Sequence, residues 1–141
     1  MTGCRVYPCL CVDDLIRSIE FYRALLGLDV VADVGWYAEL AWDADPAQIA
    51  FVARGHATVP SGCDAVRGGV LVSVIVTDAT AIHARAVGLR AELVLDLRDE
   101  DFGQRHFMVL DPDRFVVDVI EQIPPSVSFR RQLVEGRRRW R

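Results

Sequence analysis

The sequence predicts an α+β fold made of two βαβββ modules that pair into one domain. One order of elements, a strand, a capped helix and three further strands, occurs twice within residues 1–125. The chain has 141 residues, of which 52% are hydrophobic, and this is enough apolar material for one core. Because a single module cannot bury its sheet alone, we expect the two modules to share an interior.

The first predicted module spans residues 4–55. Residues 5–12 alternate and are largely apolar, which predicts a strand. Asp13 or Asp14 then caps a helix with apolar residues at steps of four, three and four, and Gly27 ends it. Three further strands are expected at residues 28–33, 36–42 and 48–53.

A glycine-containing linker, residues 56–68, leads to the second module at residues 69–123. Residues 69–76 are the most β-branched run of the chain and predict a strand. Thr77 or Asp78 caps a helix that ends at Gly88. The remaining strands are expected at residues 89–95, 105–110 and 115–120.

Composition excludes several classes of protein. No apolar run is long enough to span a bilayer, and no signal peptide precedes the first strand, so we expect a cytoplasmic protein with free thiols and no membrane partner. All 16 basic residues are arginine, and the absence of lysine and asparagine indicates a GC-rich genome. The missing lysines also exclude Schiff-base chemistry.

Charge is divided unevenly along the chain. Residues 1–125 hold 10 Arg against 19 Asp and Glu, a net charge of −9, which argues against a nucleic-acid partner. Residues 126–141 form an arginine-rich tail with 6 Arg against one Glu, a net charge of +5. Phe129, Leu133 and Val134 are spaced for one helical face. The tail is therefore either a solvated end or a segment that docks on the acidic body of its own or a partner subunit.

Several short motifs accompany this order of elements. They are Val12-Asp13-Asp14-Leu15 with Ser18, Phe21-Tyr22 and Leu26-Gly27 in the first module, and Val76-Thr77-Asp78, Gly103-Gln104-Arg105-His106-Phe107 and Asp111-Pro112-Asp113 in the second. Order and motifs together resemble the vicinal oxygen chelate superfamily, which includes glyoxalase I, bleomycin-resistance proteins and extradiol dioxygenases. The resemblance implies curved sheets around a ligand cup (the glyoxalase/bleomycin resistance fold), and a homodimer.

Four cup positions hold a divalent ion in the metal enzymes of that superfamily. The resemblance places them at Tyr7, Leu71, Asp118 and near Ala50. Leucine and alanine cannot coordinate, and a phenol is a poor replacement for imidazole, so Asp118 is left as the single suitable ligand. We therefore expect no metal and no other cofactor, with a divalent metal as the less favoured alternative.

The turn after Asp-Pro-Asp also departs from the superfamily, which usually has Gly and then Asn there. This chain has Arg114 and Phe115. Glycine permits a positive φ, so Arg114 implies either a different turn or local strain.

Strand periodicity and the resemblance together predict the residues that line the cup. A step of two from Tyr7 and Leu71 adds neighbours on the same face of each strand, and two tryptophans of one hairpin are expected at the mouth. The predicted ligand-binding residues are Tyr7, Cys9, Cys11, Trp36, Trp42, Leu71, Ser73, Gln104, His106, Met108 and Asp118.

His106 and Asp118 are the candidate catalytic residues if the protein is an enzyme. They would form a proton-transfer pair, provided that they lie within hydrogen-bonding reach. Asp118 could instead accept hydrogen bonds from Arg105 or Tyr7 in a structural role, and Cys9 and Cys11 could be small buried hydrophobes.

Three functions follow from these residues. The leading hypothesis is a metal-free protein that sequesters an aromatic or cationic small molecule, such as an antibiotic or an aromatic metabolite, as in antibiotic resistance. The first alternative is an isomerase, lyase or dioxygenase that uses His106 and Asp118 or a divalent metal. The second alternative is a non-catalytic interaction module whose cup is filled by its own side chains.

Overall fold

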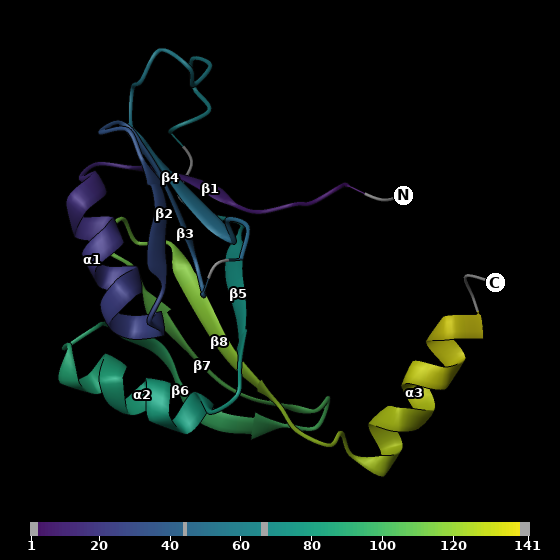
Figure 1. Cartoon of the computed structure of the whole chain (residues 1–141). Helices are drawn as coiled ribbons and strands as arrows, with labels where there is room; N and C mark the ends of the chain where they lie inside the picture. The colour runs from purple at the N-terminus through teal and green to yellow at the C-terminus, as the bar shows by residue number, and fades with distance from the viewer. Residues whose placement is uncertain (1–2, 44, 66–67, 139–141) are drawn as a thin grey trace.

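The computed structural model describes residues 3–43, 45–65 and 68–138. Within these ranges the chain forms two four-stranded mixed sheets and three helices, an α+β architecture (Figure 1). Residues 66–67 of the expected linker and 139–141 of the expected tail lie outside the described residues.

The first sheet has the strand order β1-β4-β3-β2. Strand β1 (Cys9–Val12) leads into helix α1 (Leu15–Leu26), and three strands follow, β2 (Asp29–Asp33), β3 (Tyr37–Ala41) and β4 (Ile49–Ala53). β1 is parallel to β4, whereas β4, β3 and β2 are antiparallel neighbours.

The second sheet repeats this order as β5-β8-β7-β6. Strand β5 (Leu71–Val76) leads into helix α2 (Ala79–Gly88), and β6 (Leu93–Glu100), β7 (Gln104–Leu110) and β8 (Val116–Gln122) follow. β5 is parallel to β8, and the remaining pairs are antiparallel. In each sheet the strand that precedes the helix is therefore an edge strand.

Cap chemistry fixes where the first two helices begin. The side chain of Asp14 accepts a hydrogen bond from the backbone N–H of Arg17, and that of Asp78 accepts from Ala81. Asp14 and Asp78 are thus the caps, and Asp13 and Thr77 are not. Gly27 ends α1 in the left-handed conformation at φ +69°, as predicted.

Two predicted strands have different bounds in the structure. β1 begins at Cys9 rather than at residue 5, because its register with β4 runs over residues 9–12; Pro8 before it still accepts a hydrogen bond from the Ala50 N–H. β6 begins at Leu93 rather than at residue 89. Residues 89–91 instead form the turn that closes α2, in which Arg90 has a φ of +56° and Ala91 N–H donates to the carbonyl oxygen of Ala86.

The core lies between the two helices and the two sheets. α1 and α2 contact each other and lie on the left in Figure 1, each backed by the sheet of its own module. The largest fully buried side chains of the core are Tyr22, Phe51 and Phe107. Helix α3 (Val127–Arg138) stands apart from this body on the right.

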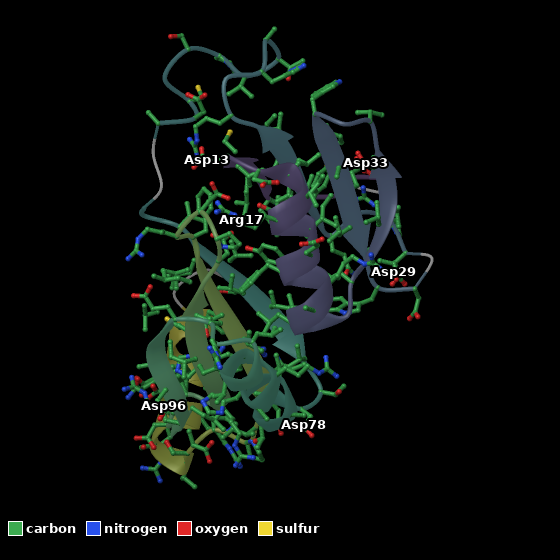
Figure 2. All side chains as sticks on the ribbon, turned by 90° about the vertical axis from the view of Figure 1, so that its left-hand side faces the viewer. Asp13, Arg17, Asp29, Asp33, Asp78 and Asp96 are labelled. Atoms are coloured by element: carbon green, nitrogen blue, oxygen red, sulfur yellow. The ribbon has the colours of Figure 1, made fainter. Side chains whose placement is uncertain are left out.

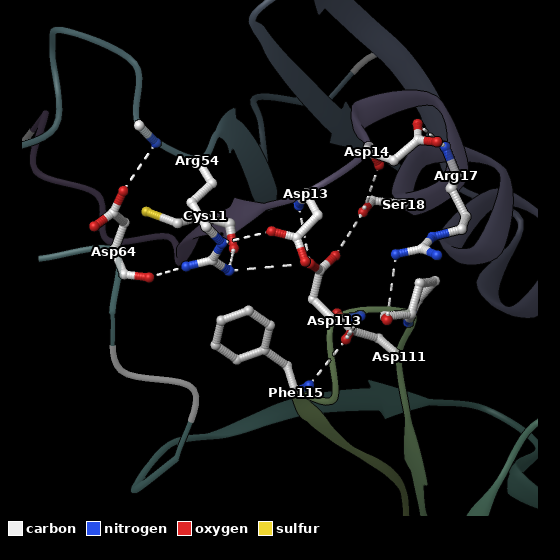
Figure 3. A network of polar contacts seen from close by, with 12 residues as sticks. Cys11, Asp13, Asp14, Arg17, Ser18, Arg54, Asp64, Asp111, Asp113 and Phe115 are labelled. Atoms are coloured by element: carbon white, nitrogen blue, oxygen red, sulfur yellow. Dashed lines mark hydrogen bonds and ion pairs between the residues drawn. The ribbon is translucent and has the colours of Figure 1, made fainter.

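The turn between β7 and β8 joins the two modules (Figure 3). Both carboxylate oxygens of Asp113 accept hydrogen bonds from module one, Oδ1 from the backbone N–H of Asp13 at 2.9 Å and Oδ2 from the Ser18 hydroxyl at 3.3 Å. The Tyr22 hydroxyl donates to Oδ2 of Asp111 at 2.9 Å. Residues of the two family-like motifs therefore bind each other across the module interface.

Arg54 extends this network at the end of β4. Its Nε donates to Oδ1 of Asp13 at 2.6 Å, and its guanidinium also donates to the backbone oxygens of Cys11 and Asp64. The guanidinium lies 4.0 Å from Oδ1 of Asp113. One arginine of module one thus contacts β1, the start of α1, the linker and the β7–β8 turn of module two.

Arg114 adopts a φ of +68°, so the strain alternative predicted for this turn is the one found. Its backbone N–H donates to the carbonyl oxygen of Asp111, and Oδ1 of Asp111 accepts from the N–H groups of Asp113 and Phe115. These bonds hold the turn in the conformation that glycine adopts more easily.

Across the described ranges, helices long and apolar enough to cross a membrane are absent.

Candidate functional site

A cavity of about 580 Å³ lies between the two modules. Its walls are the segment before β1, the inner side of α1, the β3–β4 hairpin and strand β5. The residues that line it are Val6, Tyr7, Pro8, Tyr22, Leu26, Leu28, Trp42, Gln48, Ile49, Val70, Leu71, Val72, Ser73, Val74 and Ile75. Each of these described residues is uncharged, and most are apolar.

Six consecutive residues of the lining, 70–75, belong to β5 and the residue before it. In a strand, consecutive side chains point to opposite faces, so a wall made of every residue is the edge of the strand. β5 is an edge strand that pairs with β8 on one side only. The cavity is therefore bounded by the free edge of the second sheet.

The aromatic residues of the lining have their polar atoms bonded within the protein. The Tyr7 hydroxyl lies 3.3 Å from that of Tyr37, and Nε1 of Trp42 donates to the carbonyl oxygen of Leu26 at 2.7 Å. The Tyr22 hydroxyl is bonded to Asp111. These side chains consequently offer a ligand mainly their apolar faces.

A second polar group lies on the other sheet, around His106 of β7. Nδ1 of His106 is 2.8 Å from Oδ1 of Asp118 on β8, and Nε2 is 3.2 Å from Oε1 of Glu100 at the end of β6. The histidine and Asp118 are 4% and 5% exposed. His106 and Asp118 are therefore within the hydrogen-bonding distance that a proton-transfer pair requires. The alternative partners predicted for Asp118 bind elsewhere, since Arg105 binds Asp99 and Tyr7 contacts Tyr37.

Two carboxylates on opposite ring nitrogens occupy both hydrogen-bonding atoms of His106. The bond from His106, with a further one from Arg98, holds the pKa of Glu100 below its usual value. Glu100 is the residue that sequence reasoning missed here. Its signal is the short turn before His106: Glu100 pairs with Gln104 in the β6–β7 hairpin, so Glu100 lies diagonally across from His106 on the neighbouring strand.

The four superfamily metal positions do not offer a donor set for a divalent ion. The Tyr7 hydroxyl contacts Tyr37, Leu71 and Ala50 have no donor atom, and Asp118 is bonded to His106. Asp118 and Glu100 lie on opposite sides of the imidazole ring, so these three side chains do not converge on one point.

The predicted ligand-binding residues separate into distinct groups in the structure. Tyr7, Trp42, Leu71 and Ser73 line the cavity, whereas the other seven are outside its lining. Asp118, Gln104 and Met108 lie near His106 on β7 and β8, with Met108 paired to Asp118.

Trp36 lies away from both places and stacks on His56 with ring centroids 3.8 Å apart. The two tryptophans of the hairpin therefore do not share one mouth. Gln48, Leu28 and Val70 were missed as lining residues, because their position depends on how the two modules meet.

Cys9 and Cys11 lie on β1 as free thiols; Cys9 is exposed and Cys11 is half-buried, so neither is the small buried hydrophobe expected from the sequence. Burial raises the pKa of each thiol, with Arg54 opposing this effect at Cys11. A raised pKa lowers the fraction of reactive thiolate at neutral pH, which weighs against a nucleophilic role.

Two paired βαβββ modules, joined through the Asp-Pro-Asp turn and enclosing an apolar cavity, define the class of this protein. The sequence matches the model of the Glyoxalase/Bleomycin resistance protein/Dioxygenase superfamily over residues 6–119, and the chain belongs to that superfamily. Among curated proteins, none shows significant sequence similarity to it.

Solved structures share this fold. A protein of unknown function from Agrobacterium tumefaciens str. C58 is 26% identical, with a TM-score of 0.69 over 87% of this chain and 98% of that one. TioX from Micromonospora sp. ML1 is 19% identical, with a TM-score of 0.68 over 85% and 100% of the two chains. A superfamily member from Sphaerobacter thermophilus DSM 20745 is 18% identical, with a TM-score of 0.69 over 86% and 100%.

Proposed function

We propose that this protein binds an uncharged aromatic or apolar small molecule in the cavity between its modules and holds it without chemical change. The observation that carries the proposal is the cavity itself. Its volume of about 580 Å³ suits a small organic ligand, and its described lining combines apolar side chains with the rings of Tyr7, Tyr22 and Trp42. An open cavity of this size also argues against an interaction module with a filled cup.

Binding without turnover is supported by where the ionisable groups lie. His106, Asp118 and Glu100 are all outside the described lining, so a ligand in the cavity would meet no acid or base. The donor set at the four superfamily metal positions does not suit a divalent ion, and the proposal therefore includes no metal. Sequestration then requires affinity alone.

The biological occupant in this proposal is an antibiotic or an aromatic metabolite. The superfamily description includes bleomycin-resistance proteins, which supports an antibiotic as one class of ligand. We also propose a cytoplasmic location, since the four cysteines are free thiols and a reducing compartment would keep them so.

A thermal-shift experiment with a matched pair of variants tests the proposal. The probe is N-phenyl-1-naphthylamine, a neutral aromatic compound, followed by a panel of antibiotics and aromatic metabolites. Leu71→Arg places a charge in the cavity, and Val87→Arg places the same charge on α2, outside the lining; the two native side chains are 53% and 55% exposed. Both variants should therefore fold.

Ligand at about 100 times its Kd should raise the Tm of the wild type and of Val87→Arg by roughly 10 °C, and should leave Leu71→Arg nearly unchanged. Equal shifts in the two variants, or no shift with any compound, would contradict the cavity as the binding site.

A second candidate function is proton transfer by His106 and Asp118. The 2.8 Å bond between them favours it, because a carboxylate on Nδ1 orients an imidazole whose Nε2 can exchange a proton with a substrate. Nε2 would first have to release Glu100. Each compound that binds should be incubated with wild type and with His106→Gln and analysed by mass spectrometry. Conversion by the wild type alone would establish this enzyme reading and overturn the binding-only proposal.

A further inference from the structure

Helix α3 is an addition to the fold that this chain shares with its superfamily. The family model ends at residue 119, and the solved structures described above cover 85–87% of the chain. α3 begins after that body, at Val127, and stands clear of it in Figure 1. Its role is therefore to be sought in the helix itself.

The segment before α3 is fixed to the β6–β7 turn. The N–H of Ile123 donates to the carbonyl oxygen of Gly103, and that of Ser126 donates to Asp101, each at 2.9 Å. A Cβ at Gly103 would lie 2.8 Å from the carbonyl oxygen of Ile123, so the two backbones are in close contact. Phe129 contacts Phe102 with ring centroids 6.0 Å apart. α3 cannot fold back onto its own body unless these contacts break.

One stripe of α3 combines apolar and basic side chains. Arg130, Arg131, Val134 and Arg137 follow Val127 by three, four, seven and ten positions, so the five residues share one face of the helix. Val127 and Val134 are 66% and 53% exposed, and Leu133 beside them is also exposed. This face of α3 would complement a surface on which exposed valines lie between carboxylates, because valine would pack on valine and arginine would pair with carboxylate.

The outer edge of the first sheet offers such a surface. β2 is the edge strand there, and its sequence Asp29-Val30-Val31-Ala32-Asp33 places two exposed valines between two exposed aspartates. Figure 2 shows Asp29 and Asp33 at the two ends of this strand. A free strand edge with exposed valines is a surface that proteins commonly cover with a helix.

We propose that α3 docks on the β2 edge of a second copy of this chain, and that the reciprocal contact forms a dimer. Charge supports this occupant, because the tail carries +5 and the body −9. Two α3 helices would repel each other, so the arm needs an acidic surface rather than another arm. The spacing of the charges on the two surfaces is also similar. Arg130 and Arg137 are about 10 Å apart along the helix, and Asp29 and Asp33 are about 13 Å apart along the strand.

A charge-reversal pair tests the docking. Arg131→Glu with Arg137→Glu reverses the arm, and Asp29→Arg with Asp33→Arg reverses the edge; all four side chains are exposed, so folding should be retained. Glu92→Arg is the matched control, an exposed acidic residue of the second module outside the proposed contact. Sedimentation equilibrium on full-length protein measures the dimer dissociation constant, and circular dichroism verifies the fold.

The wild type and Glu92→Arg should dimerise in the micromolar range, and each reversed protein should dissociate about tenfold or more readily at low salt. An equal mixture of the two reversed proteins should restore the dimer, because both contacts of the mixed pair are again between opposite charges. A monomeric wild type, a dimer insensitive to the reversals, or a monomer that binds duplex DNA through its tail would overturn the proposal.

Discussion

Asp113 is fully buried in the β7–β8 turn, and both of its oxygens accept hydrogen bonds from module one. Ser18, which is also buried, and the N–H of Asp13 have this carboxylate as their partner. Superfamily-like residues at these positions thus hold the two modules together and do not line the cavity. The free energy of unfolding should depend on Asp113 more than on the exposed carboxylates.

Asp113→Ala should lower the free energy of unfolding by about 3 kcal/mol, because it removes the buried acceptor of the Asp13 N–H, leaves the Ser18 hydroxyl with the Asp14 carbonyl oxygen alone and empties a fully buried position between the modules. Urea unfolding at neutral pH measures this change. Glu92→Ala, which removes an exposed carboxylate paired with Arg114 at 3.5 Å, is the control and should cost less than about 0.5 kcal/mol. A similar loss in both variants would contradict the role assigned to Asp113.

The contribution of Asp111 to the free energy of unfolding should depend on pH, and the direction of its pKa shift gives the sign. Burial raises the pKa of its carboxyl above the ordinary value, although hydrogen bonds from Phe115, Tyr22 and Asp113 oppose the shift. A raised pKa in the folded state means that the stabilising contribution is fully present below the unfolded pKa of about 3.9 and is lost as pH rises through the folded value.

Asp111→Asn should remove this contribution while keeping an oxygen for the two backbone N–H groups. The difference in unfolding free energy, wild type minus variant, should therefore fall as pH rises from about 3.5 towards neutral. Urea titrations across that range measure the difference, and the contributions of the other acidic groups cancel because they are the same in both proteins. A difference that grows with pH would show that the carboxyl is instead stabilised as an anion.

At the scale of elements, local chemistry explains what the sequence predicts well. The starts of α1 and α2 and the stop at Gly27 depend on a few neighbouring residues, and all three are found where capping chemistry places them. Strand bounds depend on a partner far along the chain. Residues 5–7 have the strand pattern but lie beyond the first residue of β4 in the register of the β1–β4 pair, and β6 is displaced because residues 89–91 close α2.

Gly27 and Gly88, each at the end of a helix, allow the effect of backbone strain to be measured apart from the effect of steric crowding. A Cβ at Gly27 or at Gly88 would have no neighbour within 4 Å, yet only Gly27 has a positive φ, of +69°. Gly27→Ala should therefore destabilise the protein by about 1 kcal/mol, whereas Gly88→Ala, in the last turn of α2, should stabilise it by up to about 0.5 kcal/mol. Thermal unfolding of both variants measures these changes. Changes of the same sign would contradict the conformational argument.

The whole molecule shows why the site was only partly predictable. Four of the predicted residues, Tyr7, Trp42, Leu71 and Ser73, line the cavity. The cavity follows the free edge of β5, which no periodicity within one strand reveals, so Val70 and Gln48 were missed. The sequence left open whether His106 and Asp118 lie within reach of each other; in the structure they are 2.8 Å apart and form a separate cluster with Glu100.

The central claim is that the cavity between the modules binds its ligand without a metal and without His106. It is tested most directly by titrating N-phenyl-1-naphthylamine in the presence of EDTA and following its fluorescence. We expect saturable binding of one probe per chain to the wild type and to His106→Gln, and its loss in Leu71→Arg. Binding that requires an added divalent ion, or that is lost in His106→Gln and kept in Leu71→Arg, would contradict the account.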